Sequence, residues 1–317
     1  MSTAIETTDL AREFASVRAV DGISFTVDSG TIFGFLGPNG AGKTTTIRLL
    51  LGLLEPTRGD ARVLGLDVRT DAAGIRAASG VLLEHPGLYE RMTAEDNLEF
   101  VGRIWRFTAA ERRARIRELL EPLGLFDRRR ETVAGWSRGM KQKLAVARAL
   151  FHRPALVFLD EPTAGLDPVA AAALRDDLVA LVRSAGVTVF LTTHNLVEAD
   201  RVCDRVAVIR AGRIVDMGRP SDLRERASGR RMVVTGWGFT ADVGGLVRAD
   251  PGVASVEVGD GRLTIGLRDG ADTSAIVPLL VRAGVVIDEV RKGTADLEEA
   301  FLTLVEGDPG PGSAGPS

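Results

Sequence analysis

A glycine-rich segment near the N-terminus has the residue types and spacing of a phosphate-binding loop. GPNGAGKT, residues 37–44, fits the pattern G-x-x-x-x-G-K-[ST]. Its glycines let successive backbone N–H groups face one anion, while Lys43 supplies a positive charge and Thr44 a hydroxyl that can ligate Mg²⁺. A strand-like run, TIFGFL at 31–36, precedes the loop, and a helical pattern begins within it. That context favours a loop that binds β- and γ-phosphates over a simple glycine-rich turn.

Two acidic residues follow another apolar run. ALVFLD at 155–160 ends in Asp160, and Glu161 and Pro162 come next. Carboxylates at the C-terminal end of a buried parallel strand lie where open α/β sheets bind ligands. Asp160 is therefore predicted to hold Mg²⁺ through its water shell, and Glu161 to orient or deprotonate an attacking water. Such a pair alone is most often a helix cap or a turn, but the phosphate loop favours the catalytic interpretation.

A further candidate for anion binding is the start of WSRGMKQKLAVARAL, at 136–150. Ser137 and Gly139 lie where a helix begins, and a hydroxyl together with free N–H groups at a helix N-terminus attracts an anion. On its own this would be an ordinary serine cap. Its position just upstream of the Asp160 strand favours a contact with phosphate.

These residues require an alternating strand and helix framework to bring them together. The first 215 residues show that alternation, which is typical of a layered α/β fold. Continuous apolar runs suit parallel strands buried on both faces, and they occur at 31–36, 155–160, 186–193 and 205–210. ISFTVD at 23–28 alternates like a half-buried antiparallel strand. Helical patterns occupy 42–52, 109–123, 138–151 and 168–185, the last with Asp167 as its predicted N-cap.

Length and composition narrow the class of protein. A chain of 317 residues suggests two domains. The net charge of −3 gives no field for general nucleic-acid binding, and one cysteine, Cys203, cannot form an internal disulfide and fits a cytosolic setting. No apolar run reaches the roughly 18 residues that a membrane span needs, and the N-terminus lacks a secretory signal. The arginine-rich stretch 103–130 is predicted to be a solvated helical face, with docking to anionic lipid as the alternative.

The pattern changes near 218–230. From there it predicts a βαββαβ order, typical of a small ferredoxin-like α+β domain, with strands at 231–236, 252–258, 261–267 and 285–291 and helices at 240–249 and 271–283. An amphipathic helix is predicted at 294–305, with Leu297, Phe301 and Leu304 on one face. The predicted division is 1–218, with a helical subdomain at about 85–150, then 219–306, and a disordered glycine- and proline-rich tail at 307–317.

The phosphate loop, the S-x-G turn before the DEP strand, the AGLDP that follows and the isolated His194 occur together and in order. In this the chain resembles the ATP-binding subunit of an ABC transporter, most closely the type-two exporter branch that includes daunorubicin-resistance-type drug efflux ATPases. The resemblance is specific over about residues 4–218. It extends more loosely to the C-terminal part, which ends in DLEEAFLTLVEG.

The resemblance implies a P-loop NTPase core with an antiparallel β subdomain and a helical subdomain, and a role for each matching residue. Phe14 would stack on adenine, Asp167 would communicate across a dimer, and Ser137 and Gly139 would touch the γ-phosphate. Lys43, Glu161 as the base and His194 as the switch histidine would carry out catalysis. The ligands of Mg²⁺ would be Thr44, Glu84 and Asp160. The matched Walker A residues are Gly37, Pro38, Asn39, Gly40, Ala41, Gly42, Lys43, Thr44 and Thr45.

Two positions depart from the family pattern. Glu84, in GVLLEHPGLYERMT, stands where a glutamine is usual, and WSRGM replaces LSGGQ, so that Arg138 stands in place of a glycine. A carboxylate can still ligate Mg²⁺, although it adds negative charge beside phosphates. Arg138 is expected to point outward or to pair with an acidic neighbour. His85 and His152 have no motif around them and are expected to be structural or surface residues.

The function that the resemblance implies is ATP hydrolysis with Mg²⁺ by a homodimer that sandwiches ATP and drives an exporter of drugs or other hydrophobic compounds. The permease would be a separate polypeptide, reached through residues 84–107, and the chain would lie at the cytoplasmic face of the membrane without binding nucleic acid. Three other classes of protein explain the sequence less well. They are a DNA- or ribosome-directed ABC ATPase, an import ATPase with a regulatory domain, and a small-molecule kinase. The first lacks its expected insertions, the second usually carries an all-β domain, and the third would not explain His194.

Overall fold

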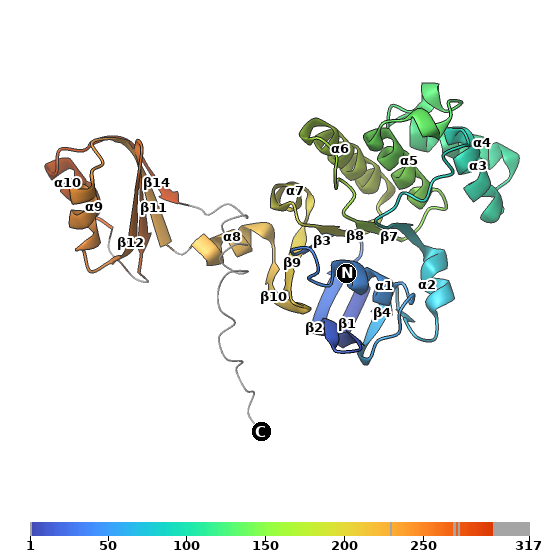
Figure 1. Ribbon diagram of the computed structural model, residues 1–317, viewed down its shortest axis with the longest axis horizontal. Coiled ribbons are helices and arrows are strands. Elements are labelled where there is room, and N and C mark those ends of the chain that lie inside the picture. The colour runs from blue at the N-terminus through green and yellow to red at the C-terminus, as the bar shows by residue number, and fades with distance from the viewer. Residues whose placement is uncertain (1, 229, 269–270, 272, 294–317) are drawn as a thin grey trace. The chain divides into compact units, whose positions relative to one another are not determined.

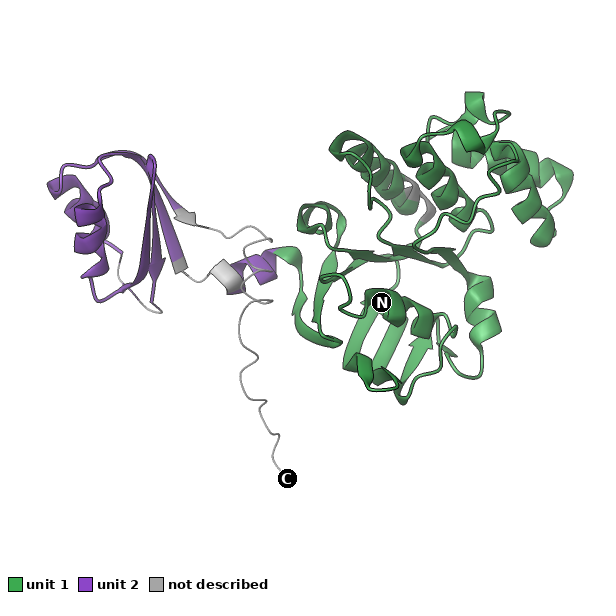
Figure 2. Cartoon of the chain, in the orientation of Figure 1, with its two compact units in different colours: residues 1–220 green, residues 221–317 purple. Residues whose placement is uncertain are grey.

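The computed structural model describes residues 2–293 except 229, 269–270 and 272. Contacts between Cα atoms divide the chain into two compact units, 1–220 and 221–317 (Figures 1 and 2). The boundary between the two units therefore falls after Pro220, whereas the sequence predicts a domain boundary after residue 218. The predicted helix at 294–305 and the tail at 307–317 lie outside the described residues. Each unit is considered by itself below.

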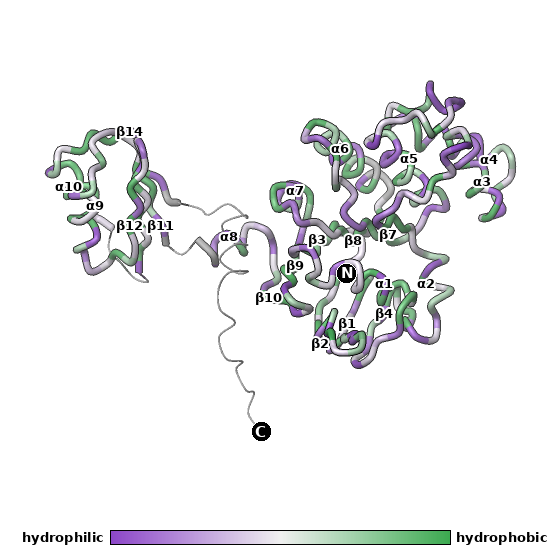
Figure 3. Tube along the Cα trace, in the orientation of Figure 1, coloured by the Kyte–Doolittle hydropathy of each residue, from purple (hydrophilic) through white to green (hydrophobic). Residues whose placement is uncertain are grey.

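The first unit is organised around a six-stranded sheet in the order β10-β9-β3-β8-β7-β6. Its strands pair in parallel, apart from β10, which is antiparallel to β9. They are β3 (Ile32–Leu36), β6 (Ser79–Leu82), β7 (Leu156–Asp160), β8 (Thr188–Thr193), β9 (Arg205–Arg210) and β10 (Arg213–Gly218). Every residue of β3, β7 and β8 is buried, as the continuous apolar runs predict. The hydropathy of these strands can be followed in Figure 3.

A second, antiparallel sheet has the order β2-β1-β4-β5. Its strands are β1 (Thr3–Phe14), β2 (Val17–Asp28), β4 (Arg58–Val63) and β5 (Leu66–Asp67). The predicted strand at 23–28 is the second half of β2. Strands β1 and β4 have no clean alternation in the sequence, because their pairing contains register shifts that interrupt the two-residue period.

Helix α1 (Lys43–Leu50) lies between the two sheets and contacts β7 on one side and β2 and β4 on the other (Figure 1). Around it five phenylalanine rings pack with neighbouring centroids 5.4 to 6.1 Å apart, namely Phe25, Phe33, Phe35, Phe158 and Phe190. This aromatic core fixes α1, and with it the loop that precedes the helix, against the ends of β3 and β7.

Helices α5 (Arg138–Leu150), α6 (Pro168–Ala185) and α7 (Leu196–Val202) cover the other face of the parallel sheet (Figure 1). Helices α3 (Ala94–Ile104) and α4 (Ala109–Leu120) pack with α5 to form the helical subdomain. The remaining helical segments of the unit are α2 (Ala72–Ala78) and 3₁₀ turns at Phe126–Arg128 and Val133–Gly135.

The arginine-rich stretch 103–130 is mostly a paired, solvated surface. Glutamates neutralise many of its guanidinium groups, for example Glu121 at 2.9 Å from Arg117. Arg115 differs, because only 7% of it is exposed and it donates to the carbonyl oxygens of Leu150 and Phe151 at 2.5 and 3.0 Å. Burial lowers the pKa of its guanidinium. The prediction of a solvated face is therefore wrong for Arg115.

The second unit begins within α8 (Pro220–Ser228) and contains a four-stranded antiparallel sheet in the order β12-β13-β11-β14. In chain order its elements are β11 (Arg230–Trp237), α9 (Ala241–Arg248), β12 (Val253–Gly259), β13 (Arg262–Leu267), α10 (Ile276–Arg282) and β14 (Val286–Gly293). The order is βαββαβ, and residues such as Val234, Val247 and Leu280 form a core separate from that of the first unit. Within the described residues, no helix is both long enough and apolar enough to cross a membrane.

Candidate nucleotide-binding site

The loop between β3 and α1 has a backbone that only glycine allows at two points. A Cβ on Gly37 would overlap the carbonyl oxygen of Ile209, and one on Gly42 would overlap that of Ala19. Gly42 also has φ 112°, which side chains strongly disfavour. The loop therefore lies tightly against its neighbours, with the N-terminus of α1 and its unpaired N–H groups opening at its end.

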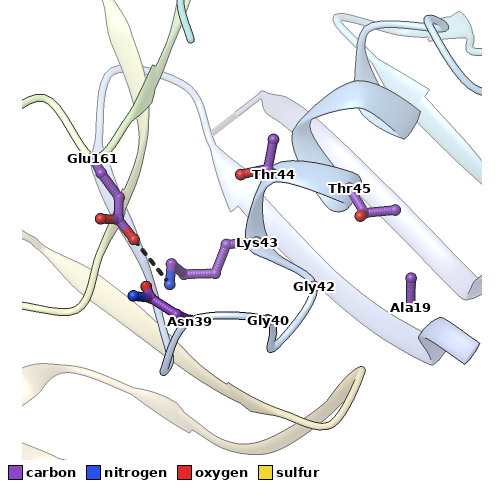
Figure 4. A pocket seen from close by; sticks show the side chains of 8 residues that line it. All are labelled: Ala19, Asn39, Gly40, Gly42, Lys43, Thr44, Thr45 and Glu161. Atoms are coloured by element: carbon purple, nitrogen blue, oxygen red, sulfur yellow. Dashed lines mark ion pairs between the residues drawn. The ribbon is translucent and has the colours of Figure 1, made fainter. Parts of the chain in front are cut away.

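Lys43 reaches back across this loop (Figure 4). Its buried ammonium group donates to the carbonyl oxygens of Gly37 and Pro38 at 2.7 and 3.1 Å and lies 3.0 Å from Oε1 of Glu161. A cavity of about 170 Å³ opens beside it, lined by Ala19, Asn39, Gly40, Gly42, Lys43, Thr44, Thr45 and Glu161. The predicted loop and the predicted base thus share one cavity, although more than 110 residues separate them in sequence.

Asp160 ends β7 and is 4% exposed. One carboxylate oxygen accepts a hydrogen bond from the Thr44 hydroxyl at 2.7 Å, and the other accepts one from the Thr192 hydroxyl at 2.5 Å. In the described part of the chain, no group of three or more His, Cys, Asp or Glu side chains is placed so that it could hold a metal ion by itself. An aspartate and a hydroxyl fit Mg²⁺, because this ion prefers oxygen ligands and usually keeps waters and substrate phosphates in its shell.

Glu161 has a left-handed backbone, with φ 48°. Its N–H donates to the backbone and hydroxyl oxygens of Thr192, each at 3.1 Å, which holds this uncommon conformation in place. Its Oε2 lies 3.0 Å from Nδ1 of His194, at the end of β8. Glu161 therefore stands between the Lys43 ammonium group and the His194 ring. Sequence reasoning missed Thr192, which contacts both acidic residues. The one feature of the sequence that could have indicated Thr192 is its position two residues before His194, in the segment TTH.

Ser137 and Asp167 are helix N-caps in the structure. The Ser137 hydroxyl accepts from the N–H of Met140 at 3.3 Å at the start of α5, and Asp167 accepts from Val169 and Ala170 at the start of α6. Neither Ser137 nor Gly139 is among the described residues that line the cavity beside Lys43. Within a single chain, the structure does not bring the S-x-G turn to the phosphate loop.

The other predicted residues also lie outside this cavity. Phe14 ends β1 with 40% of its surface exposed, and the Arg12 guanidinium lies 4.6 Å from its ring centroid. Glu84 is exposed just beyond β6, a strand that pairs with β7. Arg138 is exposed, as expected, and packs against the backbone at Gly165, where a Cβ would overlap the guanidinium. No ion pair involves Arg138 within the described residues.

The two remaining histidines have no place at the site. His152 stacks on Trp105 with ring centroids 4.2 Å apart, and its Nε2 lies 3.1 Å from the carbonyl oxygen of Ser79. Burial lowers the pKa of this imidazole, which fits a neutral packing role. His85 is exposed and follows Glu84.

The fold and this site define a class of protein. A glycine-rich loop joins a central strand to a helix, and an Asp-Glu pair ends a nearby strand, which is the arrangement of a P-loop ATPase. The ABC transporter family matches residues 20–164. The daunorubicin resistance ATP-binding protein of Streptomyces coeruleorubidus is 38% identical over 96% of this chain and 97% of its own length. The chain belongs to the ATP-binding proteins of the ABC transporter family.

Other comparisons agree with that assignment. The bacitracin transport ATP-binding protein of Bacillus licheniformis is 40% identical over 68% of this chain and 70% of its own. A solved structure described as an ATP-binding subunit of an ABC transporter is 33% identical, covers 71% of this chain and 93% of its own, and superposes with a TM-score of 0.63. The resemblance predicted from the motifs, the ABC ATPase fold and the ATPase class are confirmed. The ferredoxin-like assignment of the second unit stays a prediction.

Proposed function

We propose that the chain binds and hydrolyses ATP with Mg²⁺ as one of two identical subunits that drive export through a separate membrane permease. The observation that carries this proposal is the position of Glu161, which lies 3.0 Å from Lys43 on one side and 3.0 Å from His194 on the other. Lys43 and Glu161 share one cavity, beside the Thr44–Asp160 pair. A phosphate, a metal ion and an activated water all have partners there.

ATP would enter with its phosphates at the loop of residues 37–45 and its adenine ring near Phe14. The Lys43 ammonium group now contacts two loop carbonyl oxygens and Glu161. A γ-phosphate is a stronger partner for it than a carbonyl oxygen, because the hydrogen bond to phosphate joins two charged groups. Phosphate binding would draw Lys43 toward the nucleotide and leave the Glu161 carboxylate available to a water.

Thr44 and Asp160, with Glu84 as a further candidate, would hold Mg²⁺, which supplies positive charge to the β- and γ-phosphates. In hydrolysis, the water oxygen attacks the γ-phosphorus while the bond to the β–γ bridging oxygen breaks. Glu161 takes the proton from that water, and ADP leaves with the bridging oxygen. His194 would donate a hydrogen bond to the γ-phosphate, where negative charge is redistributed in the transition state.

A second copy of the chain would complete each site. Ser137 and Gly139 lie at the N-terminus of α5 and face no phosphate loop of their own chain. A helix N-terminus favours an anion, so this turn is suited to the γ-phosphate held by the loop of a partner chain. Asp167, at the start of α6, would lie at the same interface.

The names of relatives support a proposal about the transported compound. Relatives of the chain are named for daunorubicin resistance, bacitracin transport and fluoroquinolones export. We therefore propose efflux of drugs or other hydrophobic compounds at the cytoplasmic face of the cell membrane, through a permease that contacts residues 84–107. Nucleic acid is not a proposed partner, because the net charge is −3 and many arginines of the stretch 103–130 pair with glutamates.

Replacing Glu161 by glutamine tests this proposal. The Glu161→Gln chain should lose ATP hydrolysis and retain ATP binding, because the phosphate cradle is intact while the group that accepts the proton loses its basicity. With ATP present it should accumulate as a dimer, measured by light scattering on the full-length chain alone or with its permease. Wild-type turnover in this variant would assign the base to another residue.

A further inference from the structure

Glu198, on α7, is a buried acidic residue that the mechanism above does not use. Only 4% of the residue is exposed. Its Oε2 accepts a hydrogen bond from the Thr163 hydroxyl at 2.8 Å and a longer one from the Thr193 hydroxyl at 3.5 Å. Its own N–H donates to the side chain of Asn195, the N-cap of α7. One carboxyl group therefore joins two segments that are about thirty residues apart in sequence.

Those two segments carry the proposed reacting groups. Thr163 stands two residues after Glu161, and Thr193 stands immediately before His194. The Thr193 hydroxyl also accepts from the N–H of Asn195 at 2.9 Å, which fixes the turn that presents the histidine. Since Glu161 and His194 lie 3.0 Å apart, a small displacement of either segment would separate them.

Glu198 also lines a cavity on this side of the site. This cavity of about 470 Å³ runs along the segments, and its lining includes Glu161, Thr163, His194 and Glu198. The other oxygen of Glu198, Oε1, is buried and has no hydrogen-bond partner within the described residues. At the strand ends the two segments are already joined by the β7–β8 pairing and by the bonds from the Glu161 N–H to Thr192. Beyond the strand ends, the Glu198 carboxyl group adds a link between Thr163 and Thr193 and so further restricts their spacing.

The charge state of Glu198 fits this role. Burial raises its pKa, while hydrogen bonds from Thr163 and Thr193 and the charges of Arg175 on α6 and of His194 act in the opposite direction. Arg201 on α7 also lines the cavity. A protonated carboxyl group has nearly the shape of a carboxamide and can still accept a hydrogen bond. Glutamine is therefore the conservative replacement at this position.

We propose that Glu198 is a positioning residue that keeps Glu161 and His194 at the spacing needed for hydrolysis. It touches neither the nucleotide nor the water and acts through Thr163 and Thr193. The inference rests on the proposed roles of Glu161 and His194, and it adds a determinant of their geometry. It predicts an effect on turnover that is separate from the affinity for ATP.

The test compares Glu198→Ala with Glu198→Gln in the full-length chain. Turnover of the alanine variant should fall about ten- to hundredfold, since displacement of reacting groups by about 1 Å costs that much. Its ATP affinity, measured by equilibrium titration with a non-hydrolysable ATP analogue, should stay within about threefold, because the phosphate loop is untouched. The glutamine variant should recover most of the turnover. Glu121→Ala, which removes an exposed glutamate at the C-cap of α4, is the matched control.

A second variant keeps the test decisive if the alanine variant does not fold, as thermal unfolding will show. Thr163→Val removes the 2.8 Å hydrogen bond with little change of shape. It should lower turnover in the same direction, and its effect should not add to that of Glu198→Ala in a folded double variant, because both remove one link.

Three results would overturn the inference. The first is wild-type turnover in Glu198→Ala, or in Thr163→Val if Glu198→Ala does not fold. The second is an equal loss of turnover and of ATP affinity in Glu198→Ala, and the third is a turnover of Glu198→Gln as low as that of Glu198→Ala. These differ from failure of the proposed function, which would appear as wild-type turnover in Glu161→Gln. An inactive Glu161→Gln beside a fully active Glu198→Ala would remove only the positioning role.

Discussion

The contacts of individual side chains distinguish the residues suited to binding phosphate and metal from those suited to the reaction itself. Thr44 and Asp160 bond to each other and are suited to a metal ion, whereas Glu161 lies between a lysine and a histidine. Lys43 and Asp160 are buried, but 55% of the His194 side chain is exposed. His194 is therefore free to change partners when a nucleotide arrives, and its replacement should disturb the fold little.

His194→Ala should lower turnover by about a hundredfold to a thousandfold and leave ATP affinity nearly unchanged. The imidazole would donate its most important hydrogen bond in the transition state, where loss of one such donor costs about 3–4 kcal/mol. Steady-state ATPase rates and equilibrium ATP titration on the same preparation measure the two quantities. If rate and affinity fall together, His194 has a structural role.

Glu84→Gln should keep ATPase activity within about tenfold and weaken the apparent affinity for Mg²⁺, because a carboxylate is the stronger ligand for a hard cation. The exposed position of Glu84 beyond β6 leaves room for it to turn toward a bound metal ion. Titration of ATPase activity with Mg²⁺ gives the half-saturating concentration in both proteins. The same value in wild type and variant would falsify the ligand role and leave this residue a role in coupling to the permease.

The residues that the sequence predicted at the cavity are those whose position relative to a strand end is visible in a motif. Lys43, Asp160 and Glu161 meet in the structure for that reason. Thr192 and Glu198 could not be found in this way, because their contacts depend on strand register and helix packing. Thr192 faces Asp160 only because β7 and β8 pair in that register. Threonine and glutamate are also common residues with many other uses.

Helix α5 shows how an element presents a functional turn. Ser137 caps its N-terminus, and at the other end Arg115 of α4 donates to the carbonyl oxygens of Leu150 and Phe151. The carbonyl oxygen of Leu150 also accepts from the N–H of Arg153, whereas for that of Phe151 the Arg115 guanidinium supplies a donor at a buried helix end. Periodicity predicted both helices, but it could not show that one arginine of a charged stretch turns inward, because that depends on how α4 packs against α5.

Arg115→Ala should therefore destabilise the helical subdomain. It removes two hydrogen bonds to buried carbonyl oxygens, of which that of Leu150 keeps the N–H of Arg153 as a donor while that of Phe151 loses the Arg115 donor. Leaving a buried acceptor unpaired costs about 1–3 kcal/mol. The midpoint of chemical or thermal unfolding should fall clearly relative to wild type. Arg117→Ala, which breaks an exposed pair with Glu121, is the control and should change stability by about 1 kcal/mol or less. Equal effects of the two replacements would show that the buried contacts contribute nothing.

The whole chain consists of two units with separate cores, and the proposed chemistry belongs to the first. The described residues that line the cavity beside Lys43 all lie between Ala19 and Glu161. Continuous apolar runs made the parallel strands β3, β7, β8 and β9 of the first unit predictable, whereas the short parallel strand β6 was missed. Strands β1 and β4 were also missed, because register shifts break their alternation. The βαββαβ pattern of the second unit was visible in the sequence, but no motif recognised there indicates a function. We propose that it serves dimer contact or regulation.

A chain truncated after Pro220 should therefore keep its ATP affinity within a few fold of the full-length value. The first unit retains both of its sheets and the aromatic core around α1. Loss of a separately packed unit should leave the loop at 37–45 and the Glu161–His194 pair unchanged. Equilibrium titration with ATP on both proteins gives the affinities, and circular dichroism confirms that the shorter chain is folded. A truncated chain that is folded and monodisperse but does not bind ATP would show that the second unit is needed for the nucleotide site, and that the two units do not act independently.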